Sequence, residues 1–245
     1  MEMIEAVVLY SSNDSRFFKT CINNLLEAGV KVHVVTYSHM WNGDGENQVI
    51  LENSKKLFES HPNYIQYQID WTSGNQPWYW EGIGRYLATQ EVSPDSEYIL
   101  YIDVDEIVEL ETFKEFIQKE EYKQFDSVRL SNYWYFREPT YQSTTKEDTV
   151  VMCKTSIAKS LPPLSGGRNM YFVGNRSTLG TDKTFIHHYS WVRTKEEMIK
   201  KVSNWGHNKD RDWVSLIEQE FSHIFNGTDF VHGYQYNIVE NKFNL

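Results

Sequence analysis

The chain has 245 residues, 40% of them hydrophobic and 24% charged, which is enough for one large α/β domain with a substantial core. Its formal net charge of −10 argues against a general nucleic-acid binder, which needs clustered Lys and Arg to neutralise phosphates. Cys21 and Cys153 are isolated, the acidic start MEMIEAVVLY lacks the basic region of a signal peptide, and no apolar run reaches membrane-spanning length, so we expect a cytoplasmic protein without a transmembrane segment.

The first half of the chain alternates predicted strands and helices. Apolar residues run together or alternate in four segments, which predicts strands at residues 4–10, 30–37, 63–70 and 97–103. Apolar residues recur at helical spacing between them, which predicts helices at residues 11–29, 47–60 and 75–92. This alternation is typical of a parallel, doubly wound sheet, where ligands bind beyond the carboxyl ends of the strands.

The pattern changes after residue 110. A helix at residues 109–122 is followed by longer, antiparallel-type strands at 125–136, 148–156 and 183–191 and by helices at 194–206 and 212–225. We therefore expect a single domain over residues 1–245. Residues 1–110 would form its nucleotide-binding half, and residues 111–245 would form an acceptor half with a mixed sheet and C-terminal helices.

Acidic residues directly follow the fourth predicted strand, in YILYIDVDEIVE. Asp103 and Asp105 point the same way if the strand continues through them, and Glu106 comes next. Two converging carboxylates repel unless one takes up a proton or a divalent cation lies between them, and Mg²⁺ or Mn²⁺ there could grip a diphosphate. The alternative is that these residues only form a turn or cap the next helix.

Two segments resemble a known group of enzymes. YILYIDVDEIVE, about ninety residues after AVVLYSSND, resembles the DxDE motif of family-2-like glycosyltransferases of the GT-A fold. HHYSWVRTKEEMIKKVSNWGH is similar to the segment of the same group in which a strand-end histidine precedes a helix with lysines. The resemblance covers residues 4–210. It implies a GT-A-type α/β fold and a metal-dependent glycosyltransferase, inverting in mechanism, that moves a sugar from a nucleotide-diphosphate sugar to a glycan or other hydroxyl acceptor.

The resemblance also implies roles for the acidic motif and the two histidines. Asp103 and Asp105 would flank the donor and a Mn²⁺ or Mg²⁺ ion, with Asp105 as the direct ligand. Glu106 would support the metal ligands or contact the transferred sugar. His187 or His188 would complete the metal shell, but only one of them, because adjacent strand residues face opposite ways; we prefer His188. The alternative is that both are structural histidines.

For the nucleotide, the resemblance implies Ser11 and Asn13 after the first strand and Asp70 after the third, as contacts to the base and ribose. Arg85 would reach a phosphate or the base. As alternatives, Ser11 and Asn13 could cap the first helix, Asp70 could cap a loop, and Arg85 could lie on a solvated face.

An inverting transferase needs a carboxylate that deprotonates the acceptor. Asp182 has the offset from the DxD motif that the resemblance implies. Its competitors are Glu138, Glu147 and Asp148, and a retaining mechanism would need no such base.

Two basic segments and two other functions remain open. The loop PPLSGGRNMYFVGN, with Arg168, could cover the donor or be a plain turn. Lys200 and Lys201 could meet a diphosphate, although a solvated helix face is the simpler interpretation. The chain could also be a non-catalytic protein that binds nucleotide sugars or carbohydrates, or a DxD phosphatase with Asp103 as its nucleophile.

Overall fold

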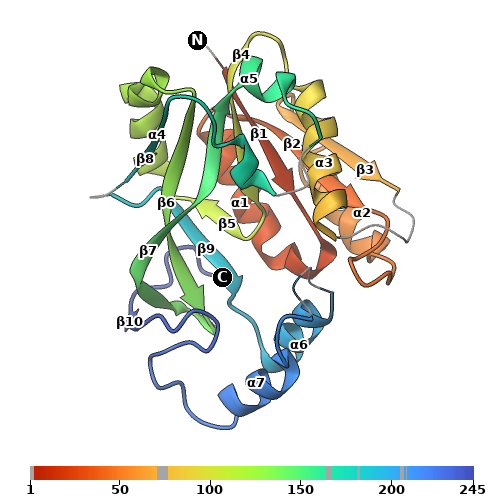
Figure 1. The fold of residues 1–245 in the computed structure, drawn as a ribbon. Coiled ribbons are helices and arrows are strands. Elements are labelled where there is room, and N and C mark those ends of the chain that lie inside the picture. Colours follow the sequence, from red (N-terminus) through yellow and green to blue (C-terminus); the bar gives the residue numbers. More distant parts are fainter. Residues whose placement is uncertain (1–2, 71–76, 164–166, 181–182, 205–206, 208) are drawn as a thin grey trace.

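One continuous mixed sheet forms the centre of the molecule (Figure 1). The computed structural model describes residues 3–70, 77–163, 167–180, 183–204, 207 and 209–245. In sheet order the main strands are β3 (Tyr64–Ile69), β2 (Lys31–Tyr37), β1 (Met3–Leu9), β4 (Ser96–Asp103), β7 (Glu138–Lys154), β6 (Ser127–Phe136), β9 (Ile186–Trp191) and β5 (Glu106–Val108). Two short strands are added, β10 (Tyr236–Ile238) on β7 and β8 (Arg176–Leu179) on β6.

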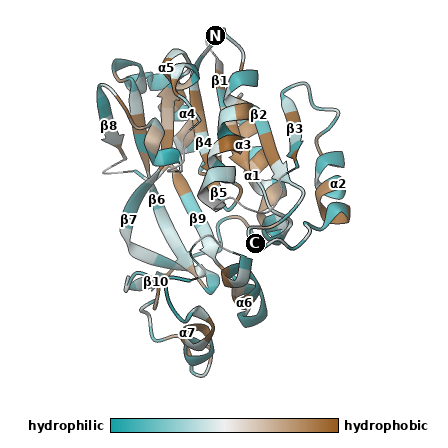
Figure 2. Cartoon of the chain, turned by 45° about the vertical axis from the view of Figure 1, so that its right-hand side comes forward, coloured by the Kyte–Doolittle hydropathy of each residue, from teal (hydrophilic) through white to brown (hydrophobic). Residues whose placement is uncertain are grey.

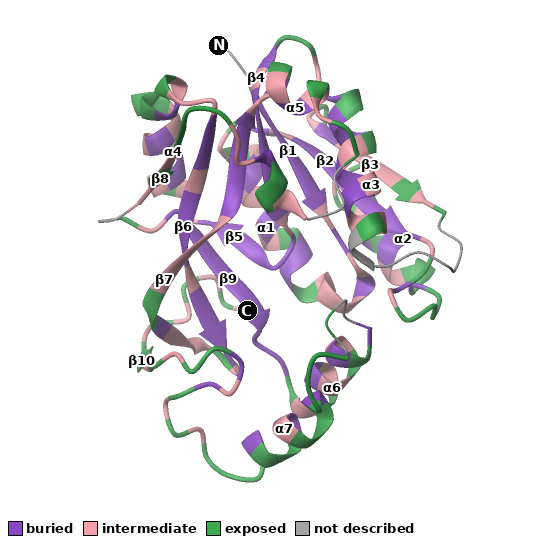
Figure 3. Ribbon diagram, viewed as in Figure 1, coloured by how far each residue is buried: buried purple, intermediate pink, exposed green. Residues whose placement is uncertain are grey.

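The predicted parallel, doubly wound half is confirmed, because β3, β2, β1 and β4 all run parallel. Helices α1 (Ser15–Glu27) and α2 (Gln48–Lys56) cover one face, and α3 (Pro77–Glu91) covers the other. Alternation along β1 supplies both faces: Ala6 and Val8 pack in the cluster that contains Phe17 of α1, and Val7 packs with Ala88 of α3. Figure 2 shows these central strands as the most hydrophobic part of the chain, and Figure 3 shows them buried.

The second half is antiparallel where β4, β7 and β6 meet, as expected, but two predicted boundaries are wrong. Strand β7 begins at Glu138, ten residues before the predicted start, and residues 155–160 form helix α5 (Thr155–Ser160) instead of ending that strand. Residues 138–147 are mostly half-buried or exposed and polar, so they carry no apolar periodicity. Pairing with β6 and β10 holds them in the sheet.

The sheet curls, and this curl positions the acidic motif. Only Val104 and Asp105 separate β4 from β5, yet β7, β6 and β9 lie between these two strands in the sheet order. The sheet must therefore bend back on itself. As a result Glu106, at the start of β5, lies opposite His188 of β9 in an antiparallel pair.

The remaining elements surround the second half. Helix α4 (Leu110–Lys119) follows β5, while α6 (Lys195–Asn204) and α7 (Trp213–Glu220) lie at the far end of β6 and β9 (Figure 1). An aromatic cluster that includes Trp134, Trp191 and Trp213 holds these two helices to the strands. Three short 3₁₀ helices complete the described elements: η1 (Ser12–Asp14), η2 (Glu121–Gln124) and η3 (Arg168–Tyr171). Over the described ranges, every helix is too short or too polar to cross a bilayer.

A buried charge in β1 makes folding sensitive to acid. The Glu5 carboxylate is fully buried and contacts His33, Lys31 and the backbone N–H of Ser93. Burial alone would raise the pKa of Glu5, but His33 and Lys31 outweigh it and lower that pKa below the ordinary 4.5. The stability this carboxylate contributes is therefore complete above pH 4.5 and is lost as the pH falls through the lower, folded-state pKa.

We expect Glu5→Gln to lose less of its stability than the wild type when the pH is lowered from 6 to 3. Urea unfolding midpoints at both pH values measure this difference. Glu52→Gln, on the exposed side of α2, is the matched control and should follow the wild type. Equal losses in all three proteins would contradict the assignment.

Candidate active site

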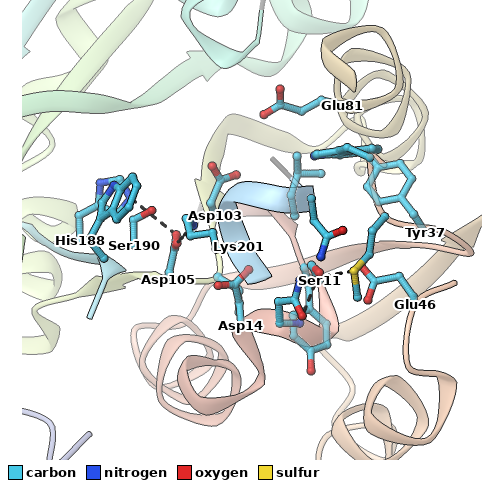
Figure 4. A pocket seen from close by; sticks show the side chains of 18 of the residues that line it. Ser11, Asp14, Tyr37, Glu46, Glu81, Asp103, Asp105, His188, Ser190 and Lys201 are labelled. Atoms are coloured by element: carbon cyan, nitrogen blue, oxygen red, sulfur yellow. Dashed lines mark hydrogen bonds and ion pairs between the residues drawn. The ribbon is translucent and has the colours of Figure 1, made fainter. Parts of the chain in front are cut away.

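A cavity of about 320 Å³ opens where β1, β2 and β4 end, which is the position at which doubly wound sheets bind ligands. This volume falls within the range of small-molecule sites. Its wall combines strand ends with side chains of β9 and α6: it includes Leu9, Ser11, Tyr37, Asp103, Asp105, His188, Ser190 and Lys201. In Figure 4 the carboxylates of Asp103 and Asp105 lie between His188 and Ser190 on one side and Tyr37 and Glu46 on the other.

Asp103 and Asp105 reach this cavity in different ways. Asp103 is the last residue of β4, whereas Asp105 lies in the turn that leads to β5. The strand alternation predicted for the pair therefore does not apply, because the strand ends at Asp103, and the N–H of Val104 makes the last bond of the β1–β4 ladder, to the carbonyl of Leu9. Both carboxylates nevertheless line the same cavity.

The carboxylate of Asp103 is held between two arginines. Arg85 donates to one oxygen at 2.9 Å, and Arg168 lies 3.3 Å from the other. Burial would raise the pKa of Asp103, but these two guanidinium groups lower it. Arg85 also pairs with Glu81 at 2.8 Å and is almost fully buried. Arg85 is thus neither on a solvated face nor among the residues that line the cavity; it orients Asp103.

Glu106 lies behind the motif as a buried, fully paired carboxylate. Arg168 donates to both of its oxygens, its Oε2 accepts from the backbone N–H of Asp103 at 2.8 Å, and Oε1 accepts from Thr149 at 3.3 Å. Glu106 has no solvent exposure and does not line the cavity. It therefore braces the motif, and Arg168, the first residue of η3, ties it to that helix.

The carboxylate of Asp105 faces two side chains of the cavity wall, the imidazole of His188, which can bind a metal, and the ammonium group of Lys201. Its Oδ1 lies 3.7 Å from Nε2 of His188, and its Oδ2 lies 3.7 Å from Nζ of Lys201. Burial raises the pKa of Asp105 even though Lys201 and His188 oppose the change. The site therefore favours extra positive charge beside this carboxylate.

Asp105 and His188 fit a divalent cation as a pair. Two atoms that both bind one ion at about 2.1 Å can be at most about 4.2 Å apart, and their separation of 3.7 Å meets this limit. On the other side of the ring, Nδ1 of His188 is buried without a hydrogen bond, and Oε1 of Glu106 lies 3.7 Å away, near enough to attract a ring N–H but too far to bond it. Within the described ranges no three His, Cys, Asp or Glu side chains gather around one point, so a ligand and water would complete the shell.

His187 faces the other side of the sheet. Its Nδ1 bonds to the hydroxyl of Tyr135 at 2.7 Å, and it lines a separate, shallow cleft with Glu109 and Lys242. Burial lowers the pKa of His187 to about 3, so the ring is neutral. Of the two histidines, only His188 lines the cavity with the acidic motif.

The opposite end of the cavity is aromatic. Tyr37 is the last residue of β2, and Trp41 lies in the loop that follows. Their rings pack edge to face with centroids 4.8 Å apart, and both line the wall. Ser11 and Asn13 also line it, and Ser11 accepts from the N–H of Asn13, which caps the short helix η1 and not α1. Glu46 joins them, with its Oε2 bonded to the N–H of Ser12 at 3.0 Å.

Asp70 is not part of this cavity. It follows β3, and its side chain is exposed. Because β2 separates β3 from β1 in the sheet, the end of β3 lies outside the wall that β1, β2 and β4 form.

Arg193 connects η1, which follows β1, with the end of β9. It pairs with Asp14 after β1, and it donates to the carbonyls of Asn13 and Ser190, each at 2.9 Å. Burial opposes ionisation of Asp14, but Arg193 and Lys201 lower its pKa. Arg193 thereby fixes the segment after β1 relative to the end of β9.

The three competitors of Asp182 for the role of catalytic base lie away from the cavity. Asp182 lies outside the described residues. Glu138 is exposed at the start of β7, Glu147 accepts from Tyr234, and Asp148 pairs with Arg129. None of these three lines the cavity.

Lys201 was a candidate for a diphosphate contact, with a solvated helix face as the simpler interpretation, and its side chain is only 15% exposed and contacts Asp105. Other lining residues were missed by sequence reasoning. Tyr37 and Glu46 border the loop after β2, and the strand-end rule could have identified them. Trp134 and His232 also line the wall, and residues 226–235 carry no periodic signal that could have indicated the histidine.

Comparisons with solved structures support the fold class. TarS of S. aureus superimposes with a TM-score of 0.50 at 14% identity, over 90% of this chain and 43% of that TarS chain. A TarS fragment in complex with UDP-GlcNAc gives 0.45 at 14% identity, over 90% of this chain and 73% of the fragment. Rv0371c of Mycobacterium tuberculosis H37Rv in complex with manganese gives 0.49 at 10% identity, covering 81% and 97%.

No protein-family model and no curated protein matches the sequence. At these identities the structural likeness concerns the fold alone, and it confirms the predicted GT-A-type α/β class.

Proposed function

We propose that this protein is a glycosyltransferase that moves a sugar from a nucleotide-diphosphate sugar to a hydroxyl acceptor, with inversion at the anomeric carbon. The observation that carries the proposal is the facing pair Asp105 and His188, 3.7 Å apart, in a cavity at the ends of parallel strands. Mn²⁺ or Mg²⁺ held there would stabilise the negative charge of the departing diphosphate.

The donor would lie along the cavity from its aromatic end to the acidic motif. Tyr37 and Trp41 offer ring faces or edges for a base, and Asn13 and Glu46 offer amide and carboxylate groups beside them. Lys201 is the one Lys or Arg among the described lining residues, which suits it to bind a diphosphate oxygen. Asp103, held by its two arginines, would bind donor hydroxyls from a fixed position.

In this scheme residues 1–110 hold the nucleotide, and residues 111–245 supply the acceptor side, where a glycan or another hydroxyl compound would bind. The phosphatase alternative requires Asp103 as a free nucleophile, but both of its oxygens lie against guanidinium groups. A non-catalytic nucleotide-sugar-binding protein would use the same cavity and differs only in lacking turnover.

Turnover tests the proposal. We expect the protein to release nucleoside diphosphate from at least one of a panel of UDP- and GDP-sugars, in the presence of methyl glycosides as acceptors and Mn²⁺, and to stop when EDTA removes the metal. Metal-dependent binding of the nucleotide without any turnover would instead favour the non-catalytic alternative.

The two histidines provide a matched pair of variants. We expect His188→Gln to reduce turnover by about 10²-fold or more, because it removes a metal-binding nitrogen and leaves Asp105 alone. His187→Gln, the neighbouring residue on the other face, should keep turnover at the wild-type level. Equal losses in the two variants would count against the assignment of His188.

A further inference from the structure

The described residues that line the cavity offer no carboxylate free of cations and donors for the acceptor hydroxyl. Its described lining carboxylates are Asp14, Glu46, Glu81, Asp103 and Asp105. Four of them already contact a basic side chain, in the pairs Asp14 with Arg193, Glu81 with Arg85, Asp103 with Arg85 and Arg168, and Asp105 with Lys201. The fifth, Glu46, accepts from the N–H of Ser12. All five also belong to or face the donor half. Among the described residues, a proton acceptor on the acceptor side must therefore be sought among groups other than these carboxylates.

We propose that His232 receives the hydroxyl proton of the acceptor, in a subsite that it forms with Trp134. This inference rests on the proposed glycosyltransferase function. His232 lies between α7 and β10, lines the cavity, and has 30% of its side chain exposed, so a ligand can reach it.

The surroundings of His232 fix the orientation of its ring. The ring packs edge to face against Trp134 at 4.6 Å and stacks on Tyr234 at 5.0 Å, and Tyr234 in turn donates to Glu147 at 3.0 Å. Nδ1 lies 4.0 Å from Oδ1 of Asp229. This separation is longer than a hydrogen bond, but it sets Nδ1 on the side of Asp229, and we assign Nε2 as the nitrogen that would meet a bound hydroxyl.

Asp229 is a firm support for this ring. Its carboxylate is fully buried and accepts from the backbone N–H groups of Val231 and Tyr234 at 2.7 and 2.9 Å, and from the hydroxyl of Tyr236 at 3.1 Å. A carboxylate behind an imidazole stabilises the cation that forms when the ring takes a proton. Burial lowers the pKa of His232 despite the carboxylates of Glu147 and Asp229, so the ring is neutral and can accept a proton near pH 7.

Trp134 connects this subsite with the metal-binding end of the cavity. Its ring contacts His188 at 4.3 Å as well as His232, so both histidines border the same indole. Its indole N–H is buried and finds no acceptor within the described part of the chain. A sugar hydroxyl bound in front of His232 could supply that acceptor, and an aromatic side chain with a polar edge suits a carbohydrate.

The step that this places on His232 is a proton transfer coupled to displacement. The acceptor O–H bond breaks and its proton moves to Nε2, while the acceptor oxygen forms a bond to the anomeric carbon. The bond from that carbon to the diphosphate oxygen breaks on the opposite face, and its electron pair leaves with the nucleoside diphosphate. The proton on His232 then passes to solvent.

The experiment compares His232→Gln with His223→Gln, an exposed histidine after α7 that does not line the cavity. Both variants should bind the nucleoside diphosphate and Mn²⁺ with wild-type affinity in calorimetric titrations. With UDP- or GDP-sugars and methyl glycosides, we expect kcat to fall by about 10²–10⁴-fold in His232→Gln only, with the donor KM little changed.

A second variant separates chemistry from structure. In His232→Ala, added imidazole should restore part of the lost kcat, whereas a purely structural role for His232 would give no rescue. Wild-type turnover in His232→Gln, or a loss that imidazole does not relieve, would overturn the assignment while leaving the proposed function intact. A wild-type protein without turnover on any donor would overturn both.

Discussion

Replacing Asp105 by Asn should abolish metal-dependent nucleotide binding without destabilising the protein. Burial raises the pKa of Asp105. The ionised carboxylate therefore lowers the stability of the ligand-free protein. The neutral amide of the same size removes that cost, so the melting temperature should stay level or rise. Binding of nucleoside diphosphate with Mn²⁺ should weaken by about 10²-fold or more, because the amide is a poor metal ligand.

Calorimetric titration and thermal unfolding measure the two effects separately. Asp95→Asn carries the same substitution on an exposed residue at the other end of β4, and both its binding and its stability should match the wild type. A large fall in the melting temperature of Asp105→Asn would show that the carboxylate is structural. Unchanged nucleotide binding would remove it from the site.

Replacing Arg168 by Met should have the largest effect on stability. This change leaves the Glu106 carboxylate, which has no solvent exposure, without the guanidinium that contacts both of its oxygens. Breaking a buried pair by removing one partner costs about 3–5 kcal/mol. For a chain of this length we expect the melting temperature to fall by roughly 10 °C.

The control for Arg168 is Arg176→Met, an exposed arginine on β8, which should change the melting temperature little. Adding Glu106→Gln to Arg168→Met should recover part of the loss, because the second change removes the uncompensated charge. If Glu106→Gln lowers the stability by the same amount in Arg168→Met as it does in the wild type, the two residues are not coupled. The bracing role of this pair would then be wrong.

The sequence predicted the elements of residues 1–110 well for a physical reason. Strands β1, β2 and β4 are buried on both faces and the helices have one apolar face, so burial leaves a periodic signal in the residues themselves. Asp103 and Asp105 were found at the cavity because any residue that follows a central parallel strand lies at its carboxyl edge. Asp70, which the resemblance implied as a contact to the base or ribose, follows the edge strand β3 and does not line this cavity.

The acceptor side could not be predicted in the same way. The first ten residues of β7 are held by their partners β6 and β10 and not by burial of an apolar face. Arg168 and Glu106 are 62 residues apart, and His232 reaches the wall from a segment without regular periodicity. These contacts depend on the curl of the sheet and on the path of the C-terminal segment, which no local pattern encodes.

Electron spin echo spectroscopy of Mn²⁺ bound with a nucleoside diphosphate tests the central claim most directly, because it detects nitrogen atoms bonded to the metal. We predict a histidine nitrogen signal in the wild type and in His187→Gln, and its loss in His188→Gln. A wild-type spectrum without nitrogen coupling, or a signal that persists in His188→Gln, would contradict the assignment of Asp105 and His188 as the metal-binding pair.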